Sequence, residues 1–156
     1  MRWFFLIFWV VLCFAVAAIG GRWTAGEIPN WYRTLQRPTF APPNWVFGPV
    51  WSLLYLLMAV AAWLVSQSAS SPVRTWGVGL FLAQLALNLA WSFLFFRQHA
   101  LGAAALEVVI LWCAIGTTTL VFGRLSPTAA WLMAPYWAWV SFASVLNIAY
   151  WRLNRG

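Results

Sequence analysis

Residues 101–123, LGAAALEVVILWCAIGTTTLVFG, form a continuous apolar run with a single charged residue, Glu107. A helix rises about 1.5 Å per residue, so about 20 such residues cross a hydrocarbon core that is about 30 Å thick. Four further apolar runs of comparable length lie at 3–21, 46–66, 77–97 and 129–152. The sequence therefore predicts five membrane-spanning helices.

The composition supports the same fold class. Of the 156 residues, 64% are hydrophobic and only 7% are charged, which leaves too little polar surface for a soluble chain of this length. Inside lipid, only helices and closed barrels pair every backbone group, and these runs are too long and too uniformly apolar for barrel strands. We expect an all-α integral membrane protein, with residues 1–156 forming one domain that is a bundle of five transmembrane helices.

The charges set the expected topology. The net charge of +7 comes from scattered arginines at the ends of the apolar runs, with no basic stripe that could follow a nucleic-acid backbone, so we expect no nucleic acid as partner. Under the positive-inside rule, the face with more arginines is cytoplasmic, which places the first loop and the C-terminus inside and the N-terminus outside. Three arginines fall on one face (Arg2, Arg74, Arg124) and six on the other (Arg22, Arg33, Arg37, Arg97, Arg152, Arg155).

Two features of the chain leave alternatives open. The first run begins with Arg2 and ends in small residues, so it has the pattern of a signal peptide, but its length and tryptophans favour an uncleaved first helix. Glu107 is either a marker of a proton or ion path, or a neutral or interface-reaching carboxyl without such a role.

No metal site or cofactor is expected. Cys13 and Cys113 both lie in apolar runs, where thiols usually act as small apolar residues. His99 has no metal-ligand partners nearby in the sequence.

Polar and aromatic residues recur on one face of three predicted helices. Amide side chains in spanning helices often hydrogen-bond to a neighbouring helix, and each such bond contributes about 0.6 kcal/mol. One interpretation is therefore that these residues only hold the helices together. Convergent amides and aromatic rings are also the usual lining of a small-molecule pocket. The second interpretation is therefore that these faces line a ligand-binding pocket. The faces comprise Trp51 and Tyr55 in the second helix, Gln84, Asn88, Trp91 and Phe95 in the third, and Tyr136, Trp139, Ala143, Asn147 and Tyr150 in the fifth.

The loop before the second helix has an unusual composition. Residues 31–51, WYRTLQRPTFAPPNWVFGPVW, hold four prolines and two arginines between aromatic residues. Pro38, Pro42 and Pro43 restrict the backbone, so the loop can cover a pocket at low entropic cost. The loop is therefore predicted to act as a lid.

Two further stretches read AQLALNLAWSFLFF at 83–96 and PYWAWVSFASVLNIAYWRLN at 135–154. Together with 31–51, five spans and this length, they make nearly the whole chain similar to the translocator protein family, the tryptophan-rich sensory proteins of bacteria and the peripheral-type benzodiazepine receptors of mitochondria. The resemblance implies a five-helix bundle, often a homodimer, whose pocket lies beneath the first loop. Short tails favour a bacterial cell membrane over the mitochondrial outer membrane.

The resemblance also implies which ligands the protein binds and which residues contact them. The expected ligands are porphyrins such as protoporphyrin IX and haem, cholesterol, and benzodiazepine-type drugs. Trp51 and Asn88 are expected to hydrogen-bond the ligand, and Trp31 and Trp139 match a pair of tryptophans associated with porphyrin breakdown. The remaining wall residues would be Tyr32, Pro42, Phe47, Gln84, Trp91, Trp139, Ala143 and Asn147.

Three functions are compatible with the sequence. The first is a receptor or translocator for tetrapyrroles with a regulatory or transport role. The second is a light- and oxygen-dependent enzyme that degrades porphyrin, although no general base or metal accompanies the tryptophans. The third is a structural bundle with an incidental pocket. Leu146, Tyr150 and Arg152 also fit a proposed sterol pattern, which matches many helix ends without any sterol.

Overall fold

The computed structural model describes all residues 1–156, and it confirms the all-α bundle with five helices long and apolar enough to span a membrane. The first loop contains two short 3-10 turns, Tyr32–Thr34 and Asn44–Val46. A π-helical turn, Phe93–Arg97, follows the third helix. The helices are α1 (Arg2–Glu27), α2 (Phe47–Ser66), α3 (Pro72–Ser92), α4 (Leu101–Leu125) and α5 (Pro127–Asn154).

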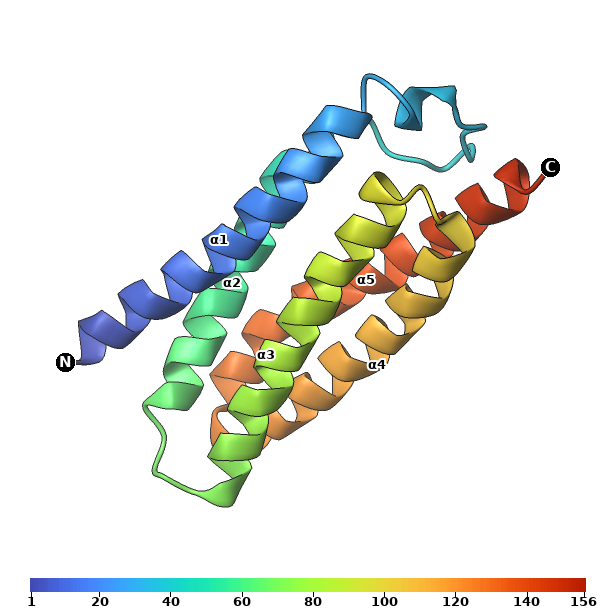
Figure 1. The fold of residues 1–156 in the computed structure, drawn as a ribbon. Coiled ribbons are helices and arrows are strands. Elements are labelled where there is room, and N and C mark those ends of the chain that lie inside the picture. Colours follow the sequence, from blue (N-terminus) through green and yellow to red (C-terminus); the bar gives the residue numbers. More distant parts are fainter.

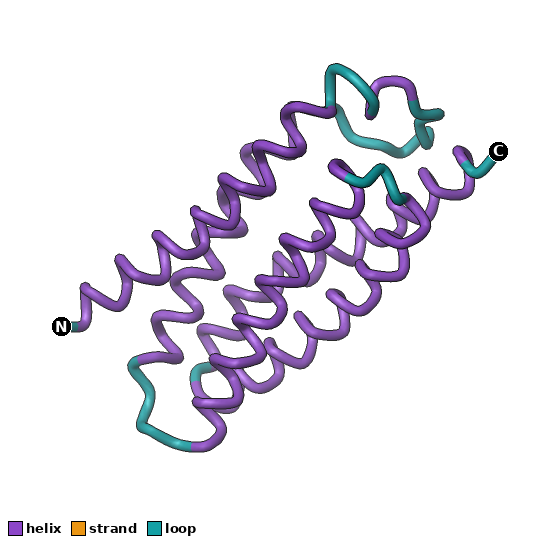
Figure 2. Tube along the Cα trace, in the orientation of Figure 1, coloured by secondary structure: helices purple, strands orange, loops and turns teal.

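The helix axes are roughly aligned, and successive helices run in opposite directions. Because the number of helices is odd, the two chain ends lie at opposite ends of the bundle (Figure 1). α1 packs mainly on α2, whereas α4 packs on α5 and α3. The segment 28–46, which we call the lid, joins α1 to α2 at the end that also holds the C-terminus and the α3–α4 connection (Figure 2).

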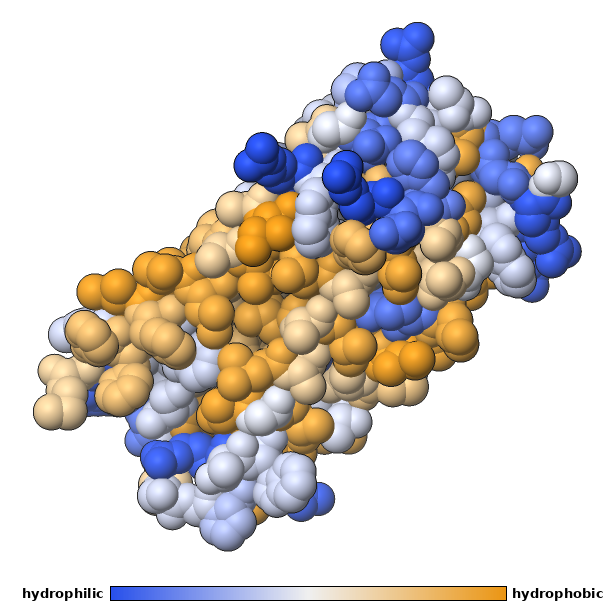
Figure 3. All heavy atoms as spheres, in the orientation of Figure 1, coloured by the Kyte–Doolittle hydropathy of each residue, from blue (hydrophilic) through white to orange (hydrophobic).

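The surface has the polarity of a membrane protein. A hydrophobic band crosses the middle of the bundle, and hydrophilic residues gather at both ends (Figure 3). Large apolar side chains such as Leu120 and Trp131 are exposed at 69% and 78% within this chain. Because lipid favours such side chains, the chain is a multi-pass integral membrane protein.

Four of the five helices extend beyond their hydrophobic runs, α1 and α3 by the most. α1 continues past residue 21 to Glu27, and α3 begins at Pro72, before residue 77. At the start of α3, the Ser71 hydroxyl accepts a hydrogen bond from the Arg74 backbone N–H, and Pro72 occupies the first helical position. Hydropathy detects only the part of a helix within the hydrocarbon core, whereas capping decides where the helix ends.

Glu107 lies inside the bundle. Its side chain is buried, and neither carboxyl oxygen has a hydrogen-bond partner. The carboxyl therefore does not reach the membrane surface. An unpaired charge would be costly at this position, so we infer a neutral carboxyl.

A glycine in α4 makes room for a tryptophan of α5. A Cβ at Gly116 would lie 2.7 Å from Cζ2 of Trp137, whose ring in turn packs on Trp112. At Gly123, also in α4, a Cβ would meet only the Ala130 Cβ at 3.4 Å, an ordinary contact. The Trp137 indole thus occupies the space that a side chain at position 116 would fill.

We predict that Gly116→Ala lowers the free energy of unfolding by about 1–3 kcal/mol, because the rigid indole must move within a packed contact. Gly123→Ala is the matched control, since it makes the same replacement in the same helix without a clash. Thermal unfolding in detergent measures both. Equal melting temperatures for the two variants would contradict this account of the α4–α5 contact.

Candidate functional site

A cavity of about 440 Å³ lies beneath the lid, enclosed by the lid and four helices. The fourth transmembrane helix, α4, contributes no lining residue, because its buried face packs on α3 and α5. The principal lining residues are Gly20, Gly21, Thr24 and Ala25 of α1, Phe47, Gly48, Trp51, Ser52 and Tyr55 of α2, Asn88 and Trp91 of α3, Phe95 and Phe96 of the π turn, and Trp139, Ala143, Leu146, Asn147 and Tyr150 of α5.

The inner end of the cavity is set by paired polar groups. The Asn88 amide donates to the Tyr55 hydroxyl at 3.0 Å, and the Tyr136 hydroxyl donates to the Gln84 side-chain carbonyl at 2.7 Å. Each pair joins α3 to a different helix, so together they fix α2, α3 and α5 in register. Trp51 packs against both tyrosine rings, with centroid distances of 5.8 and 6.2 Å.

A second pair of bonds supports the wall formed by α3 and α5. The Trp91 indole N–H donates to the Asn147 side-chain carbonyl at 2.9 Å, and the Asn147 amide donates to the Leu101 backbone carbonyl at 3.1 Å. Leu101 is the first residue of α4, where its carbonyl is close to the membrane end. Asn147 thus connects three helices, and it also lines the cavity.

The lid is held on the cavity by a tyrosine pair. Tyr32 is buried, and its hydroxyl donates to the Tyr150 hydroxyl of α5 at 2.8 Å. Burial, together with this hydrogen bond, raises the pKa of Tyr32 well above the usual tyrosine range. The hydroxyl therefore stays neutral and able to donate at physiological pH.

A further contact ties the lid to the end of α5. The Asn154 side chain accepts from the Gln36 backbone N–H at 2.8 Å and donates to the Gln36 carbonyl at 3.0 Å. Beyond this point, the Arg37 guanidinium bonds to the Ala41 and Pro42 carbonyls within the lid itself. The first half of the lid is therefore fastened across the bundle, and the second half returns to α2.

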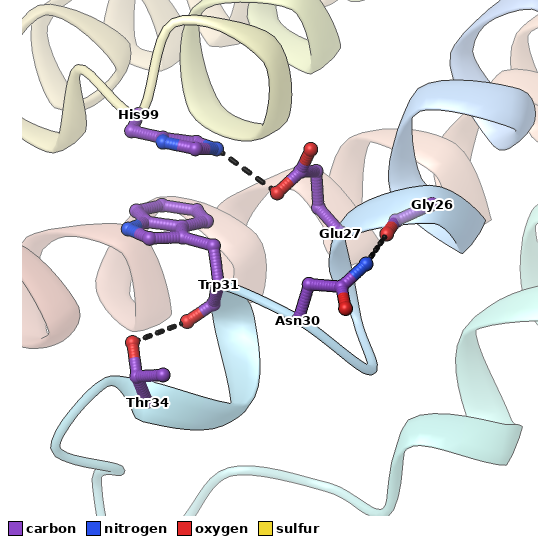
Figure 4. Close-up of polar contacts among 6 residues, drawn as sticks. All are labelled: Gly26, Glu27, Asn30, Trp31, Thr34 and His99. Atoms are coloured by element: carbon purple, nitrogen blue, oxygen red, sulfur yellow. Dashed lines mark hydrogen bonds and ion pairs between the residues drawn. The ribbon is translucent and has the colours of Figure 1, made fainter.

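Trp31 stacks outside the cavity, on the connection between α3 and α4. Its ring lies flat on the His99 imidazole at a centroid distance of 4.0 Å, and His99 Nε2 is 3.0 Å from a Glu27 carboxyl oxygen (Figure 4). His99 adopts φ 55°, a left-handed conformation that is uncommon without glycine. This cluster fastens the start of the lid to two helix ends.

Most of the residues expected from the resemblance meet at the cavity. Trp31, Pro42 and Gln84 do not line it: Trp31 stacks on His99, Pro42 accepts a bond within the lid, and Gln84 is fully buried between helices. The two tryptophans matched to porphyrin breakdown therefore do not both face the cavity. Those that line it are Tyr32, Phe47, Trp51, Asn88, Trp91, Trp139, Ala143 and Asn147.

The sterol-pattern residues do not share one surface. Leu146 and Tyr150 point inward and line the cavity, whereas Arg152 is exposed. Positions 146 and 150 are one helical turn apart, but 152 lies half a turn further on and faces elsewhere. A sterol on the outside of α5 would not meet all three.

Two polar atoms at the cavity have no partner. The Trp139 indole N–H and the Asn44 side-chain carbonyl are both buried and unbonded, and both residues line the cavity. One offers a donor and the other an acceptor, and buried polar atoms without partners are uncommon in native proteins. Because both atoms are themselves inaccessible, a ligand in the cavity would reach them only after these side chains turned.

The sequence analysis did not predict that α1 lines the cavity. Ala17, Gly20, Gly21 and Thr24 recur at helical spacing, so they form one face of small side chains, and this signal was available in the sequence. Their small size leaves room for the cavity between α1 and the aromatic walls opposite.

The chain matches the TspO/MBR family over residues 9–152. The chain belongs to the TspO/MBR family. The Translocator protein of Homo sapiens is 39% identical over 145 residues, covering 88% of this chain and 83% of the human protein. The Tryptophan-rich protein TspO of Chlorobaculum tepidum is 41% identical, covering 92% of this chain and 91% of that protein. Protein CrtK of Rhodobacter capsulatus is 35% identical, covering 94% and 90%.

In this TspO/MBR chain, we predict that Tyr32→Phe loosens the lid. Loss of one neutral hydrogen bond of about 1 kcal/mol should speed amide exchange in the lid about fivefold. Tyr150→Phe removes the same bond from the other side, so the double variant should exchange no faster than either single variant. Hydrogen–deuterium exchange of residues 28–43 measures this effect, and additive increases in the double variant would contradict the pairing.

Proposed function

We propose that the cavity binds a flat hydrophobic tetrapyrrole, such as protoporphyrin IX or haem, and that binding serves a regulatory or transport role. The observation that carries this proposal is the cavity of about 440 Å³, which is lined by three tryptophan rings of the transmembrane helices and by further aromatic side chains. This volume lies within the usual range for small-molecule sites, about 300–1,000 Å³. The names of the relatives, Translocator protein among them, agree with a transport role.

The residues around the cavity suit the chemistry of a porphyrin. The rings of Trp51, Trp91 and Trp139 line the cavity and can pack on a planar macrocycle. A porphyrin also carries anionic propionates, and the exposed Arg33 on the lid lies at the same end of the bundle. Charge-assisted bonds from a guanidinium are well suited to a carboxylate.

The same cavity would accept other hydrophobic ligands. Its lining is mostly apolar, with few polar groups to demand one particular partner, so sterol-like molecules and benzodiazepine-type drugs are further candidates. Such ligands would occupy the internal cavity rather than the outer surface of α5.

We also propose a homodimer formed through α3 in a bacterial cell membrane. Gly79, Ala83 and Ala86 are exposed on α3, and small residues at such spacing let two helices approach closely. The excess of arginine at the lid end favours a cytoplasmic lid and C-terminus, with the N-terminus outside.

We predict that Trp139→Phe weakens protoporphyrin IX binding several-fold, because the smaller phenyl ring loses part of the stacking surface, about 1 kcal/mol. Trp131→Phe is the matched control, since Trp131 lies on the same helix, is 78% exposed and is not a cavity residue. Quenching of tryptophan fluorescence by the porphyrin measures both affinities. Ala143→Phe, which fills the cavity, should reduce binding further.

Equal affinities for Trp139→Phe, Ala143→Phe and the unaltered chain would place the porphyrin elsewhere. Quenching that does not saturate in the unaltered chain would remove the proposed function altogether.

A further inference from the structure

A second hollow lies at the opposite end of the bundle from the lid, at the N-terminal end of α1. It has a volume of about 500 Å³, and one wall is almost entirely aromatic. It is lined by Phe4, Phe5, Phe8 and Trp9 of α1, by Ser66 of α2, and by Arg74 and Val78 of α3. We call this hollow the lower groove.

The walls of the lower groove are fixed by contacts between α1 and α2. The Trp9 indole donates to the Ser66 hydroxyl at 2.8 Å, and the Trp63 indole donates to the Arg2 carbonyl at 3.0 Å. In contrast, the rings of Phe4, Phe5 and Phe8 are exposed at 74%, 45% and 51%. The groove therefore has a rigid base and an open apolar wall.

Arg74 brings a positive charge to the lower groove that no acidic side chain balances. One guanidinium nitrogen donates to the Ser68 carbonyl at 2.7 Å, which leaves further N–H groups of the fork available. The two acids of the chain are elsewhere: Glu27 is bonded to His99 near the lid, and Glu107 is buried in α4. Arg2 and Arg124 add positive charge at the same end.

The position of Arg74 at a helix start strengthens the preference for an anion. Arg74 lies in the first turn of α3, a helix of 21 residues, where the backbone dipole is positive. Because the adjoining helices cross the membrane, this end of the bundle lies at a bilayer surface, and the aromatic wall extends from it toward the hydrocarbon core.

We propose that the lower groove binds an anionic phospholipid. The phosphate group bonds to the Arg74 guanidinium, and an acyl chain packs along Phe4, Phe5 and Phe8. A phosphate alone would leave the aromatic wall unused. A zwitterionic lipid, whose own ammonium group already neutralises its phosphate, would compensate the Arg74 charge less well than an anionic lipid. The site is separate from the cavity beneath the lid, and it does not depend on the function proposed for that cavity.

The test measures lipid affinity of the full chain by native mass spectrometry in detergent. Phosphatidylglycerol should bind at least tenfold more tightly than phosphatidylcholine, and Arg74→Gln should abolish this preference. Arg124→Gln is the matched control, because it removes the same charge at the same end of the bundle from an exposed residue that is outside the groove. Glycerophosphoglycerol, which has the same phosphodiester anion without acyl chains, should bind at least tenfold more weakly than phosphatidylglycerol.

The aromatic wall has its own test, which does not depend on Arg74 variants folding. Phe8→Ala should weaken phosphatidylglycerol binding several-fold, whereas Val11→Ala, at a 61% exposed position of α1 outside the groove, should leave it unchanged. The proposal is overturned if the two arginine variants behave alike, because general surface charge then explains binding. It is also overturned if glycerophosphoglycerol binds as tightly as the lipid, or if Phe8→Ala and Val11→Ala behave alike.

Discussion

The amide side chains of α3 and α5 must find hydrogen-bond partners inside the bundle, because lipid offers none. Asn88 bonds to Tyr55, Gln84 accepts from Tyr136, and Asn147 bonds both to an indole and to a backbone carbonyl. These bonds hold α2, α3, α4 and α5 at fixed positions along one another. The space above them remains open because α1 faces it with glycine, alanine and threonine. The cavity thus follows from the placement of paired amides opposite small residues.

The lid depends on the same aromatic walls. Tyr32 reaches into the bundle to bond Tyr150, and Trp31 packs on Phe95 and His99 at the α3–α4 connection. The lid therefore rests on α5 and on the end of α3, whereas its covalent links run to α1 and α2. A segment fastened on both sides can enclose an apolar ligand and still be released by the loss of a few individually weak bonds.

The sequence is sufficient to predict the five helices, because bilayer thickness sets the length of each apolar run. It also predicts the inward faces of α3 and α5, since Asn88 and Asn147 are too polar for lipid. The contact of Trp31 with His99 could not be predicted, because it depends on a left-handed turn between α3 and α4. The spacing of the fifth helix predicts that Tyr150 faces inward with Asn147, but its hydrogen-bond partner, Tyr32 of the lid, could not be predicted from the local sequence.

We propose that a planar porphyrin binds beneath the lid. Crystals grown with zinc protoporphyrin IX would locate the ligand directly, because anomalous scattering from zinc marks the centre of the macrocycle. We expect a single strong peak in the space between Trp51, Trp91 and Trp139. A peak only on the lipid-facing surface of the bundle, or no peak in crystals that contain the coloured ligand, would contradict it.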